Sequence, residues 1–158
     1  MRQVITPEAR ALIGKEGPPI KIEVEKHDIQ KYAVAINFPK PPNPLYFDEE
    51  YGKKSKYGSI IAPPTFGTSF RWMGNLTTLP LPPYRVGMNG GNEYELYKPI
   101  HPGDVLTVRA RIASLDEKPS GDNTMLIFVL EGNVVNERGE KVMTIRQTLL
   151  RMYPPETK

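Results

Sequence analysis

Four segments in the C-terminal part of the chain are rich in β-branched and aromatic residues, the composition typical of β-strands. They span 94–98, 105–115, 124–136 and 142–153. Turn-forming residues separate them, with His-Pro-Gly-Asp at 101–104, Pro-Ser-Gly-Asp at 119–122 and Asn-Glu-Arg-Gly at 136–139. Because connections this short join antiparallel neighbours, we predict that the three longer segments form an antiparallel meander.

The N-terminal half carries one further strand signal and three helix signals. Isoleucine and valine alternate with charged residues over 20–24, the period of a half-buried strand. Thr6 followed by Pro7 predicts the start of a short helix over 6–13, and a second short helix is predicted over 48–54. Apolar residues at helical spacing predict an amphipathic helix over 27–37. Its packing face comprises Ile29, Tyr32, Ala33 and Ile36.

The segment that begins at Ala62 predicts the most buried helix of the protein. Phe66, Phe70 and Met73 fall at positions i, i+4 and i+7, and no charged residue interrupts the segment before Arg71. Strands that form an antiparallel sheet need another layer to cover their apolar face. The sequence therefore predicts an α+β fold in which an antiparallel β-sheet wraps around a central helix.

Prolines are concentrated in two predicted loops. The chain has 17 prolines among 158 residues, about 11% and roughly twice the average usage. Four of them lie within 38–44, which cannot be regular structure. A second Pro- and Gly-rich stretch predicts a long connection over 74–92, and loops of this length tend to be functional or mobile. Its glycine cluster lacks the Lys-Ser/Thr and flanking elements of a phosphate-binding loop.

Length and composition are those of one globular domain over 1–158. The absence of Cys excludes disulfides, thiolate catalysis and Cys-based zinc sites, and two His residues are too few for a His-rich metal site. We expect no metal and no cofactor. The net charge of +3 comes from interspersed charges of both signs, so we expect no nucleic-acid partner. The chain has neither an apolar run long enough for a membrane span nor a signal-peptide pattern, which favours a cytoplasmic protein with no membrane partner.

Three motifs occur in order along the chain. They are Asn-Pro-Leu-Tyr-Phe-Asp at 43–48, Tyr-Gly-Ser-Ile-Ile-Ala-Pro-Pro-Thr-Phe at 57–66 and Lys-Pro-Ile-His-Pro-Gly-Asp-Val-Leu at 98–106. With the predicted order of elements, they resemble the hot-dog fold of the MaoC-like dehydratases, in particular the branch called the N-terminal half of MaoC dehydratase, or fatty-acid-synthase-type dehydratase. The resemblance implies substrates that are acyl thioesters of CoA or acyl carrier protein. It also implies hydration or dehydration across the α,β carbons, and domains that pair so that their sheets join.

Active members of that wider family carry the motif Asp-x-Asn-Pro-[Leu/Ile/Val]-His, whose Asp and His activate a water, and a later Gly whose N–H polarises the thioester carbonyl. Aligned on the Asn-Pro-Leu of this chain, the Asp position falls on Pro41 and the His position on Tyr46. Without gaps, the Gly position falls on Pro64, which has no N–H to donate. A one-residue gap would move it to Pro63 or Thr65. The sequence therefore predicts no catalytic residue in this chain.

Nearby polar residues are poor substitutes for the missing pair. The Tyr46 hydroxyl has an ordinary pKa near 10 and is a weak base at neutral pH. Asp48 and Glu49 are expected to stabilise the N-terminus of the helix predicted over 48–54. His27 and His101 are expected to face solvent or to cap the elements that begin there.

Binding functions remain open to this chain. The Thr65 and Phe66 amides at the start of the predicted central helix can receive a thioester carbonyl. The candidate walls of an acyl tunnel are apolar or aromatic: Tyr46, Phe47, Phe66 and Phe70. The cluster of Lys53, Lys54 and Lys56 is either a solvated loop or a contact for the phosphates of CoA or of a carrier protein.

Three functional hypotheses follow from the resemblance and from the missing motif. The leading one is a non-catalytic, substrate-binding subunit of a heteromeric (R)-specific enoyl-CoA or acyl-ACP hydratase/dehydratase, whose MaoC-like partner supplies the Asp and the His. The second is a stand-alone hydratase or thioesterase that uses other acids such as Asp48 or Glu49, because the fold alone does not choose the chemistry. The third is a homo-oligomeric module that binds an acyl-CoA without turnover.

Overall fold

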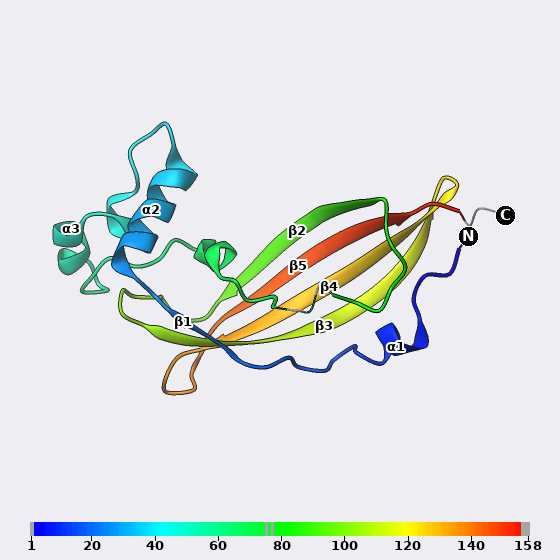
Figure 1. Ribbon diagram of the computed structural model, residues 1–158. Helices are drawn as coiled ribbons and strands as arrows, with labels where there is room; N and C mark the ends of the chain where they lie inside the picture. Colours follow the sequence, from blue (N-terminus) through cyan, green and yellow to red (C-terminus); the bar gives the residue numbers. More distant parts are fainter. Residues whose placement is uncertain (1, 75, 77, 156–158) are drawn as a thin grey trace.

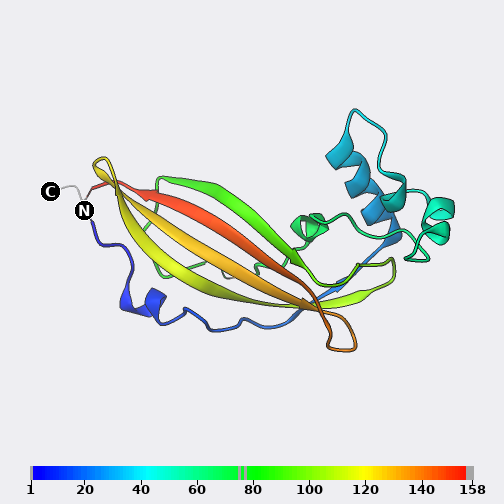
Figure 2. The ribbon, with the colours of Figure 1, turned by 180° about the vertical axis from the view of Figure 1, so that it is seen from behind.

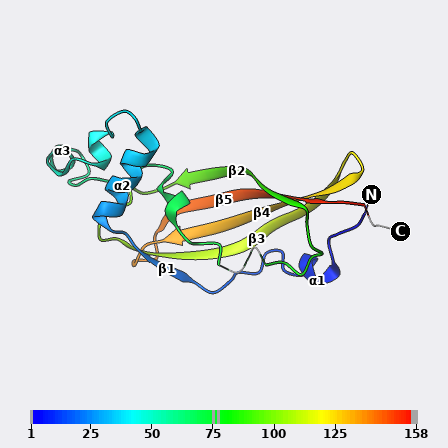
Figure 3. The same cartoon turned by 45° about the horizontal axis from the view of Figure 1, so that its top comes forward.

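The computed structural model describes residues 2–74, 76 and 78–155. Along this part of the chain the elements are α1 (Pro7–Arg10), β1 (Ile20–Glu23), α2 (Lys26–Asn37), η1 (Pro44–Tyr46), α3 (Glu49–Lys54), η2 (Phe66–Ser69), β2 (Val86–Leu96), β3 (Val105–Ser120), β4 (Asn123–Val135) and β5 (Lys141–Tyr153). The strands form one antiparallel sheet in the order β1-β3-β4-β5-β2. Helices α2 and α3 lie beyond one end of the curved sheet, and α1 lies near the other end (Figure 1, Figure 3).

The predicted meander is confirmed. Strands β3, β4 and β5 pair in sequence, and the turns between them fall where the sequence placed them. Gly121 and Gly139 have φ of +59° and +75°, which residues with a Cβ rarely adopt. Strand β3 runs to Ser120, five residues further than the predicted segment, because it keeps pairing with β4 up to the turn at Gly121.

The predicted helices over 27–37 and 48–54 are confirmed as α2 and α3, and the first helix ends earlier, at Arg10. The predicted packing face of α2 is only partly right. Ile29 and Ala33 are buried, whereas Ile36 is 51% exposed, because the last turn of α2 extends past the end of the sheet (Figure 1). Among the described residues, no helix is both long and apolar enough to cross a membrane.

The prediction of a connection over 74–92 is wrong in its second half, because β2 begins at Val86 and includes the glycine cluster. Strand β2 pairs with β5 along its length, with a bulge between Asn89 and Gly91. Close packing accounts for Gly90: a Cβ there would lie 3.1 Å from Thr148 Cγ2 and 3.3 Å from Leu150 Cγ. Gly90 therefore lets the edge strand lie close against β5 at the bulge.

The predicted central helix after Ala62 is also wrong, because η2 is a single 3₁₀ turn and Phe70 already has extended backbone, with ψ 135°. A serine side chain explains the early end. Ser69 Oγ donates to the Phe66 carbonyl at 2.7 Å, which is the acceptor that an α-helix would give to the Phe70 amide. The Phe70 amide instead donates to the Gly67 carbonyl at 3.2 Å. The chain that follows η2 crosses the sheet face seen in Figure 1, and Figure 2 shows the opposite face.

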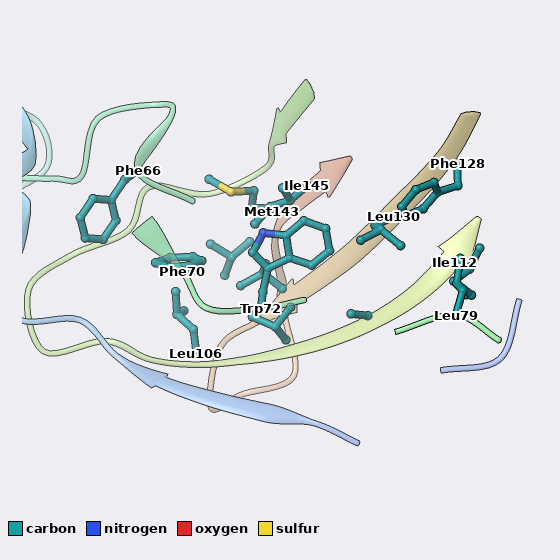
Figure 4. Close-up of a cluster of buried hydrophobic side chains, with 14 of the residues drawn as sticks. Phe66, Phe70, Trp72, Leu79, Leu106, Ile112, Phe128, Leu130, Met143 and Ile145 are labelled. Atoms are coloured by element: carbon teal, nitrogen blue, oxygen red, sulfur yellow. The ribbon is translucent and has the colours of Figure 1, made fainter. Parts of the chain in front are cut away.

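The hydrophobic core lies between that chain and the concave face of the sheet. Phe70, Trp72 and Leu79 cover the face, and the strands supply the side chains beneath them (Figure 4). These are Leu106 and Ile112 of β3, Phe128 and Leu130 of β4, and Met143 and Ile145 of β5. The indole of Trp72 rests on Gly132, where a Cβ would lie 2.8 Å from Trp72 Cε3. The sheet must therefore carry a glycine at this point.

The convex face carries a network of ion pairs across four strands. Glu131 of β4, only 7% exposed, accepts from Arg111 of β3 at 2.7 Å and from Arg146 of β5 at 2.8 Å. Arg146 also contacts Glu93 of β2 at 2.6 Å. Burial disfavours the ionised form of Glu131, but the hydrogen bonds from Arg146 and Arg111 outweigh it and hold the pKa of this carboxyl below its ordinary value. The network joins neighbouring strands by charge as well as by backbone hydrogen bonds.

The contact between Trp72 and Gly132 predicts a specific sensitivity to added volume. We expect Gly132→Ala to destabilise the protein by about 1–3 kcal/mol, because the new methyl group overpacks the site beneath the indole. Urea unfolding followed by circular dichroism measures the change. Gly17→Ala is the matched control, since its Cβ would meet only atoms at 3.7 Å or more. Equal stability of the two variants would contradict this account.

The lowered pKa of Glu131 predicts pH-dependent stability. Ionised Glu131 stabilises the fold above its ordinary value of 4.5, and this contribution is lost as the pH falls through the lowered folded-state pKa. We expect Glu131→Gln to cost about 1–3 kcal/mol at pH 7 and progressively less as the pH falls below that value. Urea unfolding at several pH values tests this, with the exposed turn variant Glu137→Gln as the control. A cost for Glu131→Gln that does not change with pH would refute the assignment.

Candidate functional site

Of the three positions aligned with the Asp, His and Gly of the family motif, two line one cavity of about 370 Å³. Tyr46 reaches it from η1 and Pro64 from the segment before η2. Backbone hydrogen bonds hold the walls together: the Ile61 amide donates to the Leu45 carbonyl at 3.2 Å, and the Ala62 amide donates to the Ile100 carbonyl at 2.8 Å. The third position, Pro41, is exposed and does not line the cavity, and its carbonyl accepts a hydrogen bond from the Asn37 side chain.

The described side chains around this cavity offer neither a carboxylate nor an imidazole. The ionisable groups among them are three tyrosines, Tyr46, Tyr57 and Tyr97, and Lys98. Lys98 is already engaged with Glu140, at 2.7 Å. Together with Asn136 and Arg138, Lys98 lowers the pKa of Glu140 to about 2. The cavity is therefore equipped to hold a ligand but has no general base of ordinary strength.

A larger cavity, of about 590 Å³, is lined in part by η2. Phe66 and Phe70, two of the predicted tunnel walls, line it together with Tyr32 of α2 and with Ile20 and Ile22 of β1. Its lining also includes six charged side chains: Lys21, Glu23, Glu25, Asp28, Lys31 and Arg71. The Tyr32 and Phe66 rings pack edge to face with centroids 5.5 Å apart, as do the rings of Phe66 and Phe70. Interlocking aromatic rings give this cavity a fixed inner wall.

Phe47, predicted as a further wall, lines neither of these cavities. Its ring is exposed, and its carbonyl accepts a hydrogen bond from Gln30 Nε2 at 2.8 Å.

Tyr32 also fixes the residue that follows Pro64. Its hydroxyl donates to the Thr65 carbonyl at 2.8 Å and lies 2.9 Å from Thr65 Oγ1. Only one of the two amides predicted to receive a thioester remains available. The Phe66 amide donates to the Pro63 carbonyl at 2.9 Å, whereas the Thr65 amide has no acceptor in the part of the chain that the structure describes. The sequence identified Tyr32 only as a packing residue, because nothing in the helical spacing of α2 points to its hydroxyl contact.

The predicted lysine cluster lies on and after α3, and its members differ in how they are engaged. Lys53 pairs with Glu50 at 2.7 Å, which raises the pKa of this lysine. Lys56 lies 5.1 Å above the ring of Tyr57, and Tyr57 lines the smaller cavity. Lys54 is exposed. Of the three, Lys56 is the one placed beside a cavity.

Asp48 and Glu49, the acids of the stand-alone enzyme hypothesis, are engaged in structural contacts. Asp48 caps α3, since its carboxylate accepts from the Glu50 and Tyr51 amides at 2.9 and 3.1 Å. Glu49 pairs with Lys26 at 2.9 Å, and this hydrogen bond lowers the pKa of Glu49. A lowered pKa makes a carboxylate a weaker base. No group of three or more metal-binding side chains gathers anywhere in the described residues.

Residues 11–145 match the model of the FAS1-like dehydratase domain region. The chain belongs to this family. A UPF0336 protein of Streptomyces avermitilis is 32% identical over 141 residues, which cover 85% of this chain and 89% of that protein.

Solved structures share the fold. A MaoC-like dehydratase from Rhodospirillum rubrum superimposes with a TM-score of 0.63 at 24% identity, covering 91% of this chain and 94% of that one. One chain of the C-terminally truncated HadBC (3R-hydroxyacyl-ACP dehydratase) complex from Mycobacterium tuberculosis superimposes with a TM-score of 0.71 at 24% identity, covering 88% of this chain and 96% of that one. The fold of this family member is therefore the hot-dog fold, as predicted.

The contact between Tyr32 and Thr65 predicts that the hydroxyl groups of Tyr32 and Tyr46 contribute differently to the free energy of unfolding. We expect Tyr32→Phe to lower the free energy of unfolding by about 1 kcal/mol, because it removes the hydroxyl that holds Thr65. Tyr46→Phe is the matched control, since the Tyr46 hydroxyl has no hydrogen-bond partner among the described residues. Thermal and urea unfolding of both variants measure the difference, and an equal effect of the two changes would contradict the role of Tyr32.

Proposed function

We propose that this chain is the non-catalytic, substrate-binding subunit of a heteromeric hydratase or dehydratase that acts on acyl thioesters of CoA or acyl carrier protein. One observation carries the proposal: the cavity that Tyr46 and Pro64 line has neither a carboxylate nor an imidazole. Addition of water to an enoyl thioester needs a base for the water and an acid for the α carbon. This cavity supplies neither group, so in the proposed complex both come from the partner.

The residues of this chain hold the substrate in the proposed complex. The Thr65 amide, positioned through Tyr32, is the donor left for a thioester carbonyl. Phe66 and Phe70 form an apolar wall for the acyl chain. Lys56 beside Tyr57 is the favoured contact for a phosphate of CoA or of the carrier, with exposed Lys54 beyond it and Lys53 held by Glu50. The chain itself needs no cofactor in this role, since the thioester is the substrate.

The β2 edge supports association with a partner. It is 11 residues long and no other strand of the described residues pairs with its outer side, whereas β1 at the other edge has four residues. Val86 and Met88 on β2 are 43% and 44% exposed. A long, exposed edge strand with apolar side chains is a template for pairing with another sheet. We therefore propose that the catalytic partner, which brings the Asp and the His, joins its sheet to this edge. The HadBC complex provides a precedent for assembly within the fold.

Reconstitution with a partner tests the function. We expect the chain alone to hydrate no enoyl thioester, and a complex with a MaoC-like protein that carries Asp-x-Asn-Pro-x-His to do so. Replacing the partner's motif Asp with Asn should abolish turnover, because that carboxylate activates the water. Full turnover by this chain alone would refute the proposal, as would inactivity with every motif-bearing candidate. Acyl-CoA binding without any partner dependence would instead favour a binding module.

Variants at the two sheet edges locate the partner. Met88→Asp on β2 is expected to weaken association at least about tenfold, because it places a charge in an apolar contact. Lys21→Asp on β1 is the matched control, since it makes a larger change in charge at the opposite edge and should leave association unchanged. Analytical ultracentrifugation gives the readout for both variants, and the hydration assay is read for Met88→Asp alone, because Lys21 also lines the cavity of Phe66 and Phe70. Equal effects of both variants would place the interface elsewhere.

A further inference from the structure

A further cavity adjoins the one lined by Phe66 and Phe70, and a single described residue lines both. The cavity of Phe66 and Phe70, the first cavity, has about 590 Å³. The adjoining one, the second cavity, has about 520 Å³, and both volumes are within the range of small-molecule sites. Ile20 of β1 is the lining residue that they share. The side chain of Ile20 thus stands where one space ends and the next begins.

The adjoining cavity is apolar on its inner side. Trp72 and Leu79 form one wall, and Ala110 and Ile112 of β3 form the floor. Leu12 and the segment that leads to β1 close the side opposite the Trp72 wall. Hydrogen bonds fasten that segment to β3: the amides of Gly14 and Gly17 donate to the carbonyls of Ile112 and Ala110, each at 2.8 Å. Lys15 and Glu16 also line this cavity, and the apolar remainder of its lining suits a hydrocarbon chain.

The two cavities follow one another along the concave face of the sheet. Figure 4 shows Phe66, Phe70, Trp72 and Leu79 in succession over the strands. Phe66 and Phe70 line the first cavity, whereas Trp72 and Leu79 line the second. A thioester held near Thr65, next to Phe66, would therefore direct its acyl chain past Phe70 toward Ile20.

Ile20 is held at this boundary from two sides. Its backbone is fixed by pairing with Val108 in the sheet. A Cβ built on Gly74 would lie 3.6 Å from Ile20 Cδ1, so the backbone there packs against the end of the isoleucine side chain. Ile20 is therefore the residue that both cavities share, and its side chain is held in place there.

We infer that Ile20 determines the length of acyl chain that this subunit accepts, with short acyl groups ending in the first cavity and longer chains passing Ile20 to lie against Trp72. The inference rests on the proposed function, which places the thioester carbonyl at the Thr65 amide. Trp72 is the only tryptophan of the chain, so its fluorescence reports on the second cavity alone. Filling of that cavity can thus be measured without any enzymatic turnover.

Titration of the full chain with butanoyl and dodecanoyl thioesters of pantetheine tests the inference. We expect the dodecanoyl thioester to bind more tightly and to change the Trp72 emission, and the butanoyl thioester to bind without that change. Ile20→Phe should weaken dodecanoyl binding at least about tenfold, the effect of withholding some two methylene groups from an apolar site. The same variant should suppress the Trp72 response and weaken butanoyl binding much less than dodecanoyl binding, because Ile20 borders the first cavity only at its end toward Trp72.

Ile22→Phe is the matched control, because Ile22 lies two residues further along β1 and lines the first cavity only. It should weaken both thioesters alike. Ile20→Ala should keep dodecanoyl binding, and circular dichroism establishes that each variant is folded. If Ile20→Phe leaves dodecanoyl affinity and the Trp72 signal unaltered, the inference is wrong.

The outcome of the thioester titrations and the outcome of the assay with a catalytic partner can be told apart. A response of Trp72 that depends on chain length, in a chain that activates no partner, would uphold the acyl site and reject the proposed subunit role. An active complex that hydrates short and long enoyl thioesters equally well, with Ile20 or with Phe at this position, would uphold the subunit role and reject the length control.

Discussion

The packing of Trp72 against the sheet is the contact on which the rest of the structure depends. The indole reaches the backbone of β4 because Gly132 has no side chain there. That close approach anchors the chain after η2 across the concave face, where it covers Leu130, Met143 and Ile145 (Figure 4). Without it, the apolar faces of the central strands would be open to water, and the cavities on either side of the covering segment would lose a wall.

The chain that follows η2 covers the sheet in extended conformation, and this geometry differs from that of a helix. An α-helix advances 1.5 Å per residue, whereas extended chain advances roughly 3.3 Å. The residues from Phe70 onward therefore span about twice the length of sheet that a helix of the same residues would cover. Phe66, Phe70 and Trp72 are spread along the concave face instead of stacking on one side of a helix, and cavities lie in a row beneath them. The early end of η2, caused by the Ser69 hydroxyl, thus has a consequence for ligand binding.

In the proposed complex, binding and association occupy different parts of the molecule. The cavities lie on the concave face and at the end where α2 and α3 gather. Their walls come from residues before β2, from β3 and, in the cavity around Tyr46, from residues 96–100. The exposed β2 edge contributes only Leu96 to the cavity around Tyr46. The ion-pair network on the convex face ties Glu93 of that edge, through Arg146, to Glu131 in the middle of the sheet. The edge offered to a partner is therefore stabilised by the sheet rather than by the ligand.

The sequence by itself determined the meander, the turns at Gly121 and Gly139, helices α2 and α3, and the family, because these depend on local periodicity and on short motifs. It also placed proline or tyrosine at the positions where active relatives need an acid, a base and a donor. Only the tertiary structure decided that the glycine cluster is strand, since its pairing with β5 outweighs local propensity. The segment after Phe66 is extended partly for a local reason, the Ser69 hydrogen bond that ends η2, and partly through its packing across the sheet. The contact of Tyr32 with Thr65 and the position of Ile20 between two cavities join residues distant in sequence, and only the folded chain brings them together.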